Sequence, residues 1–529
     1  MTREIEFLAR EALRGRLNRR DFLGRAAALG LTLPVASKLL SSTALAQGPQ
    51  KGGDLIVGLV GGESTNSLDP ASWLSQVPQV FGKTWGETLV YSNPEDGSPV
   101  PLLAESWEAS DDVKQWTFKI RKGVTFHDGK EMTAEDVVAT LKRHADPEGK
   151  SGALGLMEGI AEMKADGDNV VLTLTSGNAD MPLLLSDYHL VIQPNGGIDD
   201  PAAGIGTGPY KVEANEPGVR HVSTKYENHW RDDVGFVDSI EILVMNDTTA
   251  RMSALQSGQV HMINRVEPKT VELLKASPNV IIQRAPSKGH YVFIMHCNTP
   301  PFDNKDLRMA LKLAMDREAM VNQILQGYAT IGNDFPINEA YAFFPEGIEQ
   351  RAYDPEEAKH YYQKSGHSGP ILLRTSDVAF PGAVDATVLY QQQAAAAGIQ
   401  IDVRREPGDG YWDQVWNVQP FCASYWGGRP TQDSMYSTAY SSNADWNDTR
   451  FFREDFDKLL LEARGELDPA RREELYRQMA IMVRDDGGLI LPMFNDFIDA
   501  HTDQVQGWVR DPNYEMSGLS APIRVWLAQ

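Results

Sequence analysis

Residues 102–143 read LLAESWEASDDVKQWTFKIRKGVTFHDGKEMTAEDVVATLKR, and this stretch predicts a strand, a turn and a capped helix in succession. The segment QWTFKI alternates polar and apolar residues, as a half-buried β-strand does. Asp128 and Gly129 form a turn pair. Thr133 and Asp136 have the spacing of a helix capping box, with Asp in place of the usual Glu. The stretch is therefore typical of a mixed α/β domain.

The rest of the chain continues this alternation of strands and helices. Residues 169–177 (NVVLTLTSG) predict a strand followed by a turn, and residues 291–298 (YVFIMHCN) predict a strand buried on both faces. Residues 303–325 predict one helix that begins at a polar cap, either Asp303 or Asn304. Because the chain has 529 residues, we expect an α/β protein with more than one core.

The composition excludes some classes of partner. The formal net charge is -23, which argues against nucleic-acid binding because that needs clustered Lys and Arg to displace counterions. Apolar residues make up 42% and charged residues 23%, as in ordinary globular proteins. Beyond residue 46, no stretch approaches the roughly 20 continuous apolar residues of a membrane-spanning helix.

Residues 1–46 differ from the rest and predict an export signal. Arg19 and Arg20 precede a short apolar run that ends in small residues up to Ala46. This pattern resembles a twin-arginine signal peptide, so we expect cleavage near Ala46 and a periplasmic location. A membrane anchor is the alternative, but Pro34 and Lys38 interrupt the apolar run.

The sequence offers little that is typical of catalysis. The motifs G-x-S-x-G, H-E-x-x-H and C-x-x-C are absent, and the eleven histidines are scattered. The best local pair, His127 and Asp128, lies in the strand-to-helix turn, where Asp usually serves backbone hydrogen bonds. We expect neither an enzyme, nor a cofactor, nor a metal. Cys297 and Cys422 are interpreted as two separate thiols, with a single bridge as the alternative.

Six segments, taken in order, resemble the extracellular solute-binding proteins of family 5, the oligopeptide-, dipeptide- and nickel-binding receptors of ABC importers. Together they span nearly all of the chain after residue 46. They are residues 102–143, 204–212 (GIGTGPYKV), 226–232 (YENHWRD), 298–329, 352–366 (AYDPEEAKHYYQKSG) and 455–479.

This resemblance implies a two-lobed α/β periplasmic binding protein of type II, with an extra inserted domain and a hinge-bending cleft. Ligand binding would close the lobes, and the closed, monomeric receptor would dock on a membrane permease. The implied division is a signal peptide (1–46), domain I (47–90, 204–286 and 497–529), an inserted domain II (91–203) and domain III as the second lobe (287–496).

The resemblance also points to the segment ASYWGGRPTQD, residues 423–433. In peptide-binding relatives an aromatic-Trp pair, two small residues and an aspartate line the cleft, and the aspartate binds the ligand's α-amino group. Here Trp426, Gly427 and Gly428 match, but Arg429 stands in place of the aspartate. An arginine presents donors suited to a carboxylate or phosphate, so the expected anchor has reversed its charge.

Alternatives remain for this site. Arg429 could pair with Asp433 or another local acid and never meet a ligand, or Asp433 could bind an amino group beside Arg429. The resemblance places further cleft residues in both lobes: Leu74, Ser75, Gln76, and Tyr411 or Trp412, with Trp416 as a weaker candidate.

We therefore expect a receptor for a peptide-like or opine-like small solute with an anionic group. The first alternative is a receptor for ordinary di- or oligopeptides. A less favoured alternative is a nickel-complex receptor, which would need a histidine near the cleft; His296 and His501 are the only loose candidates.

Overall fold

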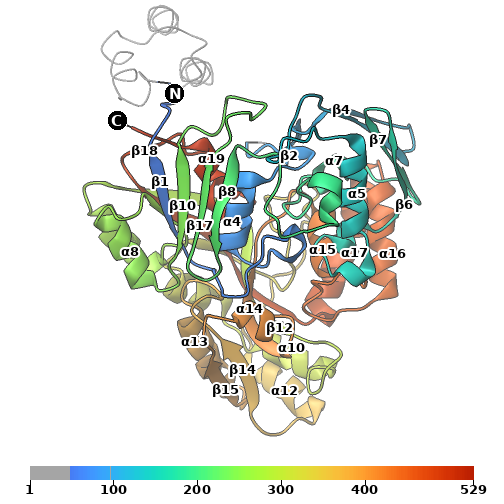
Figure 1. Cartoon of the computed structure of the whole chain (residues 1–529). Coiled ribbons are helices and arrows are strands. Elements are labelled where there is room, and N and C mark those ends of the chain that lie inside the picture. The colour runs from blue at the N-terminus through green and yellow to red at the C-terminus, as the bar shows by residue number, and fades with distance from the viewer. Residues whose placement is uncertain (1–47, 96, 529) are drawn as a thin grey trace, which may run out of the picture.

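The computed structural model describes residues 48–95 and 97–528. Its largest element is one mixed sheet that runs through both lobes of the protein (Figure 1). In spatial order its strands are β15 (Ile401–Arg405), β14 (Ile371–Thr375), β16 (Phe421–Trp426), β12 (Val280–Met295), β17 (Leu489–Thr502), β11 (Met262–Ile263), β1 (Asp54–Leu59), β10 (Ser239–Val244), β9 (Arg220–Lys225) and β8 (Tyr210–Glu216), with β13 (Ala329–Ile331) beside β17.

Two long antiparallel strands, β12 and β17, join the lobes. They pair from Val280 with Thr502 to Ile294 with Leu489, and the register shifts between Pro286 and His290. Every residue of β17 is buried. The predicted buried strand at residues 291–298 is confirmed through Met295, where β12 ends. In Figure 1, α13, β14 and β15 lie at one end of these strands, and β1 and β10 lie at the other.

A separate antiparallel sheet packs against α5 in the first lobe. Its order is β4 (Ala104–Ala109), β5 (Gln115–Ile120), β7 (Asn169–Leu174) and β6 (Ile160–Asp166). The alternation of QWTFKI is confirmed, because Trp116, Phe118 and Ile120 are buried in this domain's own core. The capping box is confirmed as well: the backbone N of Asp136 donates to Thr133 Oγ1, and the backbone N of Thr133 donates to Asp136 Oδ2 at 3.0 Å.

The helix predicted over residues 303–325 is shorter than expected. Asn304 caps α10 as predicted, but α10 ends at Leu313. Asp316 then caps a second short helix by accepting from the backbone N of Ala319. The prediction of one continuous helix is wrong, because α10 ends at Leu313 and a new helix begins after the cap at Asp316.

The remaining elements complete the layers around these sheets. Two short hairpins pair β2 (Val90–Ser92) with β3 (Pro99–Pro101) and β18 (Val505–Gln506) with β19 (Trp526–Leu527). The α-helices are α4 (Gln76–Trp85), α5 (Ala134–His144), α6 (Leu154–Met157), α7 (Met181–Leu184), α8 (Thr248–Gln256), α9 (Val271–Lys275), α10 (Lys305–Leu313), α11 (Arg317–Ala319), α12 (Pro355–Ser365), α13 (Ala383–Ala396), α14 (Tyr411–Gln414), α15 (Gln432–Ala439), α16 (Glu454–Gly465), α17 (Pro469–Asp486), α18 (Glu515–Gly518) and α19 (Ala521–Arg524).

Several expectations about the whole chain meet the structure only in part. The predicted signal peptide lies outside the described residues. Among the described residues, no helix is both long and apolar enough to cross a bilayer. Cys297 and Cys422 are both free thiols, so the alternative of a bridge is wrong. The division into domains at residues 90, 203, 286 and 496 stays a prediction.

A buried ionic cluster stabilises the second lobe around Asp334. Its carboxylate accepts two hydrogen bonds from Arg317 Nη2, at 2.7 and 2.6 Å, and lies 2.9 Å from Arg351 Nε. The backbone N of Leu491 in β17 donates to the same carboxylate at 2.9 Å. Burial alone would raise the pKa of Asp334, but Arg317, Arg351 and Lys312 lower it, so the group is charged.

We expect Asp334→Asn to lower the free energy of unfolding by about 3–5 kcal/mol, because the buried Arg317 would lose its counter-charge and Arg351 would keep only Asp485. Asp168→Asn serves as the control, since Asp168 pairs with Lys122 at the surface, where solvent screens the pair and its loss should change stability little. Chemical denaturation of both variants measures the difference. Equal losses of unfolding free energy in the two variants would contradict the role of Asp334 as a buried counter-charge.

Candidate functional site

The segment that follows β16 carries the candidate site. β16 pairs antiparallel with β12, and its last residue, Trp426, lies opposite His290. The chain then leaves the sheet through Gly427 and Gly428 and reaches Arg429 before Thr431 caps α15. Arg429 is therefore held at the end of a central strand of the sheet.

Arg429 is buried, with only 1% of its surface exposed. Its Nη1 donates to the carbonyl oxygen of Gly428 at 3.1 Å, and its Nε lies 3.7 Å from Asp187 Oδ2. The guanidinium carbon lies 5.5 Å from the ring centres of both Tyr188 and Tyr514. Arg429 Nε has no hydrogen-bond partner among the described residues. A buried donor without a partner is costly, so this atom is suited to an additional acceptor.

The acid beside Arg429 is Asp187, which follows α7 in the first lobe. Asp187 Oδ1 accepts from the backbone N of His189 at 3.0 Å and lies 2.6 Å from His189 Nδ1, whereas Oδ2 has no hydrogen-bond partner among the described residues. Burial alone would raise the pKa of Asp187, but His189 and Arg429 lower it to about 2. Asp187 is thus a buried carboxylate with one free oxygen. No local signal in the sequence marked Asp187, because it lies in none of the motifs.

Asp433 forms a buried ion pair with Arg464. Arg464 Nε donates to its Oδ1 at 2.8 Å, and Ser437 Oγ donates to the same oxygen at 3.0 Å. Asp433 is completely buried in this pair and does not line the cavity at Arg429. The alternative in which Arg429 pairs with Asp433 is therefore wrong, and the acid that Arg429 faces comes from the other lobe.

Tryptophan side chains form one wall of the site. The indole Nε1 atoms of Trp416 and Trp426 donate to Asp448 Oδ2 at 2.9 and 3.0 Å, which fixes both rings. Trp446 lies against both, with ring centres 5.6 and 6.1 Å away. Burial raises the pKa of Asp448 to about 7. Trp416, which the sequence suggested only as a weaker cleft candidate, is therefore part of this wall. Trp446 is also part of it but was not predicted.

These groups surround a small cavity of about 30 Å³ between the lobes. Organic ligands occupy pockets of roughly 300–1,000 Å³, so a solute enters only when the walls separate. Trp412 Nε1 and Tyr514 Oη are further buried polar atoms without partners among the described residues. The lining residues are Leu74, Gln76, Gln79, Tyr188, Trp412, Trp416, Tyr425, Trp426, Gly427, Arg429, Trp446 and Tyr514.

Three predicted cleft residues besides Asp433 do not line this cavity. Ser75 Oγ donates to the carbonyl oxygen of Gly61 at 2.5 Å. Tyr411 Oη donates to the carbonyl oxygen of Ala423 at 2.7 Å. Gly428 is packed against the chain itself, because a Cβ there would lie 2.6 Å from Lys288 Cβ. These three residues support the site's backbone.

Comparison with known proteins places the chain in a family. Residues 98–448, more than half of the chain, match the profile of "Bacterial extracellular solute-binding proteins, family 5 Middle". The chain is 26% identical over 501 residues to the glutathione-binding protein GsiB of Shigella boydii serotype 4, covering 90% of this chain and 95% of the relative.

Solved structures show the same fold. The chain resembles the periplasmic binding protein DppA of Helicobacter pylori, in complex with the peptide STSA, with a TM-score of 0.82, 20% identity, and coverage of 91% of this chain and 99% of the other. It also resembles AgaA from A.tumefacien R10, in complex with agropinic acid, with a TM-score of 0.81, 23% identity, and coverage of 90% and 99%. The protein therefore belongs to family 5 of the bacterial extracellular solute-binding proteins.

Proposed function

We propose that the protein is the periplasmic receptor of an ABC importer that captures a peptide-like or opine-like solute carrying an anionic group. The observation that carries this proposal is Arg429, a buried guanidinium that lines the cavity between the lobes and whose Nε has no hydrogen-bond partner among the described residues. A carboxylate of the solute would accept from this atom. The predicted export signal and the family support delivery of the solute to a membrane permease by a monomeric receptor.

The tryptophan wall of the cavity favours a solute with an apolar or planar part. Trp412, Trp416 and Trp426 line the cavity together, and rigid indole rings provide large contact areas. Among similar proteins, GsiB is named for glutathione, and AgaA was solved with agropinic acid. Both observations are compatible with a small, acid-bearing solute.

The second candidate, an ordinary peptide receptor, is favoured by one feature of Asp187. Its Oδ2 has no hydrogen-bond partner among the described residues and lies 3.7 Å from Arg429 Nε. Asp187 does not itself line the cavity, so a solute with both an amino group and a carboxylate would satisfy Asp187 and Arg429 at once only if separation of the lobes exposes Asp187. Asp187 takes over here the role that the sequence suggested for Asp433. The nickel alternative gains no support, because the described residues contain no group of three or more potential metal ligands.

Closure of the cleft would rest on contacts that join the lobes directly. Glu63 follows β1 in the first lobe, and its Oε1 accepts from the backbone N of Trp412 in the second lobe at 3.2 Å. The backbone N and Oγ of Ser64 donate to Asp409 Oδ1 at 2.9 and 3.0 Å. These bonds break when the lobes separate, so they contribute only to the closed state.

Native mass spectrometry of the receptor purified from the periplasm tests the proposed function. We expect a small acid to co-purify with the wild type and to be lost from Arg429→Gln, which keeps most of the side-chain volume. Arg404→Ala, at an exposed arginine in β15, should retain the solute. Thermal melting confirms that each variant is folded.

A neutral or purely cationic solute held equally by the wild type and Arg429→Gln would contradict the hypothesis that Arg429 binds an anionic group of the solute. An ordinary peptide that is lost from Asp187→Asn but kept by Arg429→Gln would favour the second candidate.

Affinity should depend on pH through Glu63. Burial, followed by the nearby charges of Asp413 and Asp409, raises the pKa of Glu63 in the closed form to about 7, although the backbone N of Trp412 opposes the shift. In an open cleft the carboxyl group would return towards its ordinary pKa of about 4.3. Closure therefore takes up a proton, and it is favoured as the pH falls through 7.

We expect affinity for the co-purified solute to rise about tenfold between pH 8 and pH 6, as measured by calorimetry. Glu63→Gln, which is neutral throughout, should flatten this dependence. If the affinity of the wild type does not change with pH, or if Glu63→Gln shows the same pH dependence, then the contact between Glu63 and Trp412 does not control closure.

A further inference from the structure

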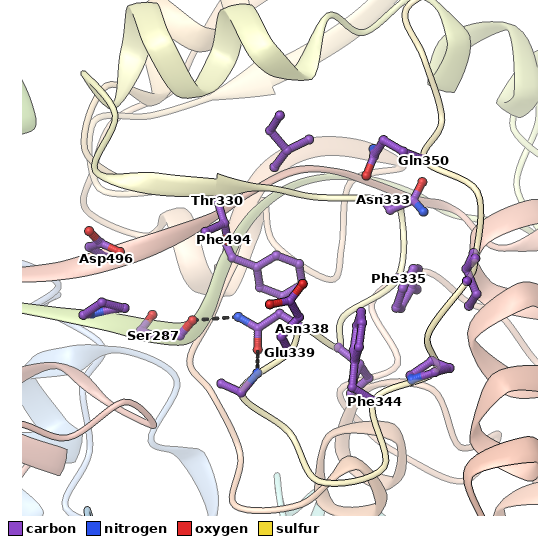
Figure 2. A pocket seen from close by; sticks show the side chains of 17 residues that line it. Ser287, Thr330, Asn333, Phe335, Asn338, Glu339, Phe344, Gln350, Phe494 and Asp496 are labelled. Atoms are coloured by element: carbon purple, nitrogen blue, oxygen red, sulfur yellow. Dashed lines mark hydrogen bonds between the residues drawn. The ribbon is translucent and has the colours of Figure 1, made fainter.

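A second, larger cavity lies on the second lobe, where the two joining strands cross into it. Its volume is about 380 Å³, within the range of pockets that hold small organic molecules. Its walls come from β12, β13, β17 and the loop at residues 333–350 (Figure 2). No residue lines both this cavity and the one at Arg429.

Three phenylalanine rings provide the apolar part of this cavity. Phe335 and Phe344 stack with ring centres 6.4 Å apart, and Phe494 of β17 lines the same space. Ile331, which also lines the cavity, is 40% exposed. The cavity thus presents apolar surface to solvent.

The amide side chains in the wall are used by the protein itself. Asn338 Nδ2 donates to the carbonyl oxygen of Ser287 at 2.9 Å (Figure 2). Asn333 Nδ2 donates to the carbonyl oxygen of Glu349 at 3.0 Å, and Gln350 Nε2 donates to that of Gly332 at 2.8 Å. These bonds hold the loop in place and pre-form the cavity.

The charges of the lining are all negative. Among the described residues, the only ionisable ones that line the cavity are Glu339 and Asp496, and none of them is a Lys, Arg or His. Asp496 is paired with Arg284. Glu339 is exposed, lines the cavity together with Phe494, and has no ion pair or side-chain hydrogen bond among the described residues (Figure 2). It is the free charge of the cavity.

We propose that this cavity is a second binding site, for a small organic ammonium ion with an apolar body. The ammonium group would pair with Glu339, and the body would lie against Phe335, Phe344 and Phe494. Aromatic faces attract cations, which adds to the carboxylate's attraction. An anionic molecule would face like charge and no donor with a positive charge, so the solute class proposed for the cleft is excluded here.

The same loop connects this site with the cleft. Ile337, Asn338, Glu339 and Ala340 line the second cavity. The next residue, Tyr341, accepts at its Oη a hydrogen bond of 3.1 Å from the backbone N of Arg429. A molecule bound against Glu339 therefore rests on the loop that positions the cleft's arginine.

Calorimetry with phenethylammonium tests the proposal, with phenylacetate as the probe of the same shape and opposite charge. We expect the full-length folded receptor to bind phenethylammonium and not phenylacetate. Glu339→Gln should weaken binding about tenfold or more, as loss of a charged partner does. Glu346→Gln, at an exposed acid on the same loop outside the cavity, should bind as the wild type does.

Three results would overturn the proposal: no binding of phenethylammonium, equal binding of phenylacetate, or equal affinities of Glu339→Gln and Glu346→Gln. Because Glu339 is exposed and without a partner among the described residues, its substitution should leave the melting temperature unchanged. Failure of these tests leaves the proposed function standing, because none of them uses the cleft's solute or changes a residue that lines the cavity at Arg429.

Discussion

A guanidinium group buried away from water needs a negative partner, and Arg429 places this requirement at the meeting point of the two lobes. Its partner within the protein is Asp187, but Nε lies 3.7 Å from Asp187 Oδ2, longer than a charged hydrogen bond. The surrounding residues come from distant parts of the chain: Tyr188 from the first lobe, Tyr341 from the second and Tyr514 from the C-terminal segment. The fold therefore holds a positive charge that its own residues satisfy only in part.

The long strands β12 and β17 explain how this charge is held and how it could be released. They are the sheet's connection between the lobes, and the register of their pairing shifts after Pro286. Immediately beyond, Lys288 Nζ donates to the carbonyl oxygens of Arg429 and Pro430 at 3.3 and 3.1 Å. The strand that joins the lobes thus also holds the arginine's backbone. A movement of the lobes about these strands would open the cavity while Arg429 stays on its strand end.

Local features of the fold could be predicted from the sequence, because local physics decides them. The alternation of QWTFKI, the capping box of Thr133 and Asp136 and the cap at Asn304 all depend on neighbours in the chain. The second cap at Asp316 was equally local, but the apolar pattern continued across it and hid the break. The resemblance supplied the fold, and it supplied Trp426 and Arg429.

The resemblance also supplied Leu74, Gln76, Trp412 and Gly427, which line the cavity. Asp187 and Trp446 could not be predicted, and Asp433 was misassigned, because their roles depend on distant contacts. Asp433 looked like a free acid near Arg429, yet Arg464, 31 residues further on, pairs with it. Asp187 lies 242 positions before Arg429 and has no motif around it. Trp446 joins the wall only because Trp416 and Trp426 are brought to it by the fold.

The most direct test of the central claim is a crystal structure of the receptor with the solute that it carries from the periplasm. We expect an anionic oxygen of that solute to lie within hydrogen-bond distance of Arg429 Nε, with the rest of the solute against the tryptophan wall. A solute that binds in the cleft while Arg429 pairs only with Asp187, or that presents an amino group to this position, would contradict it.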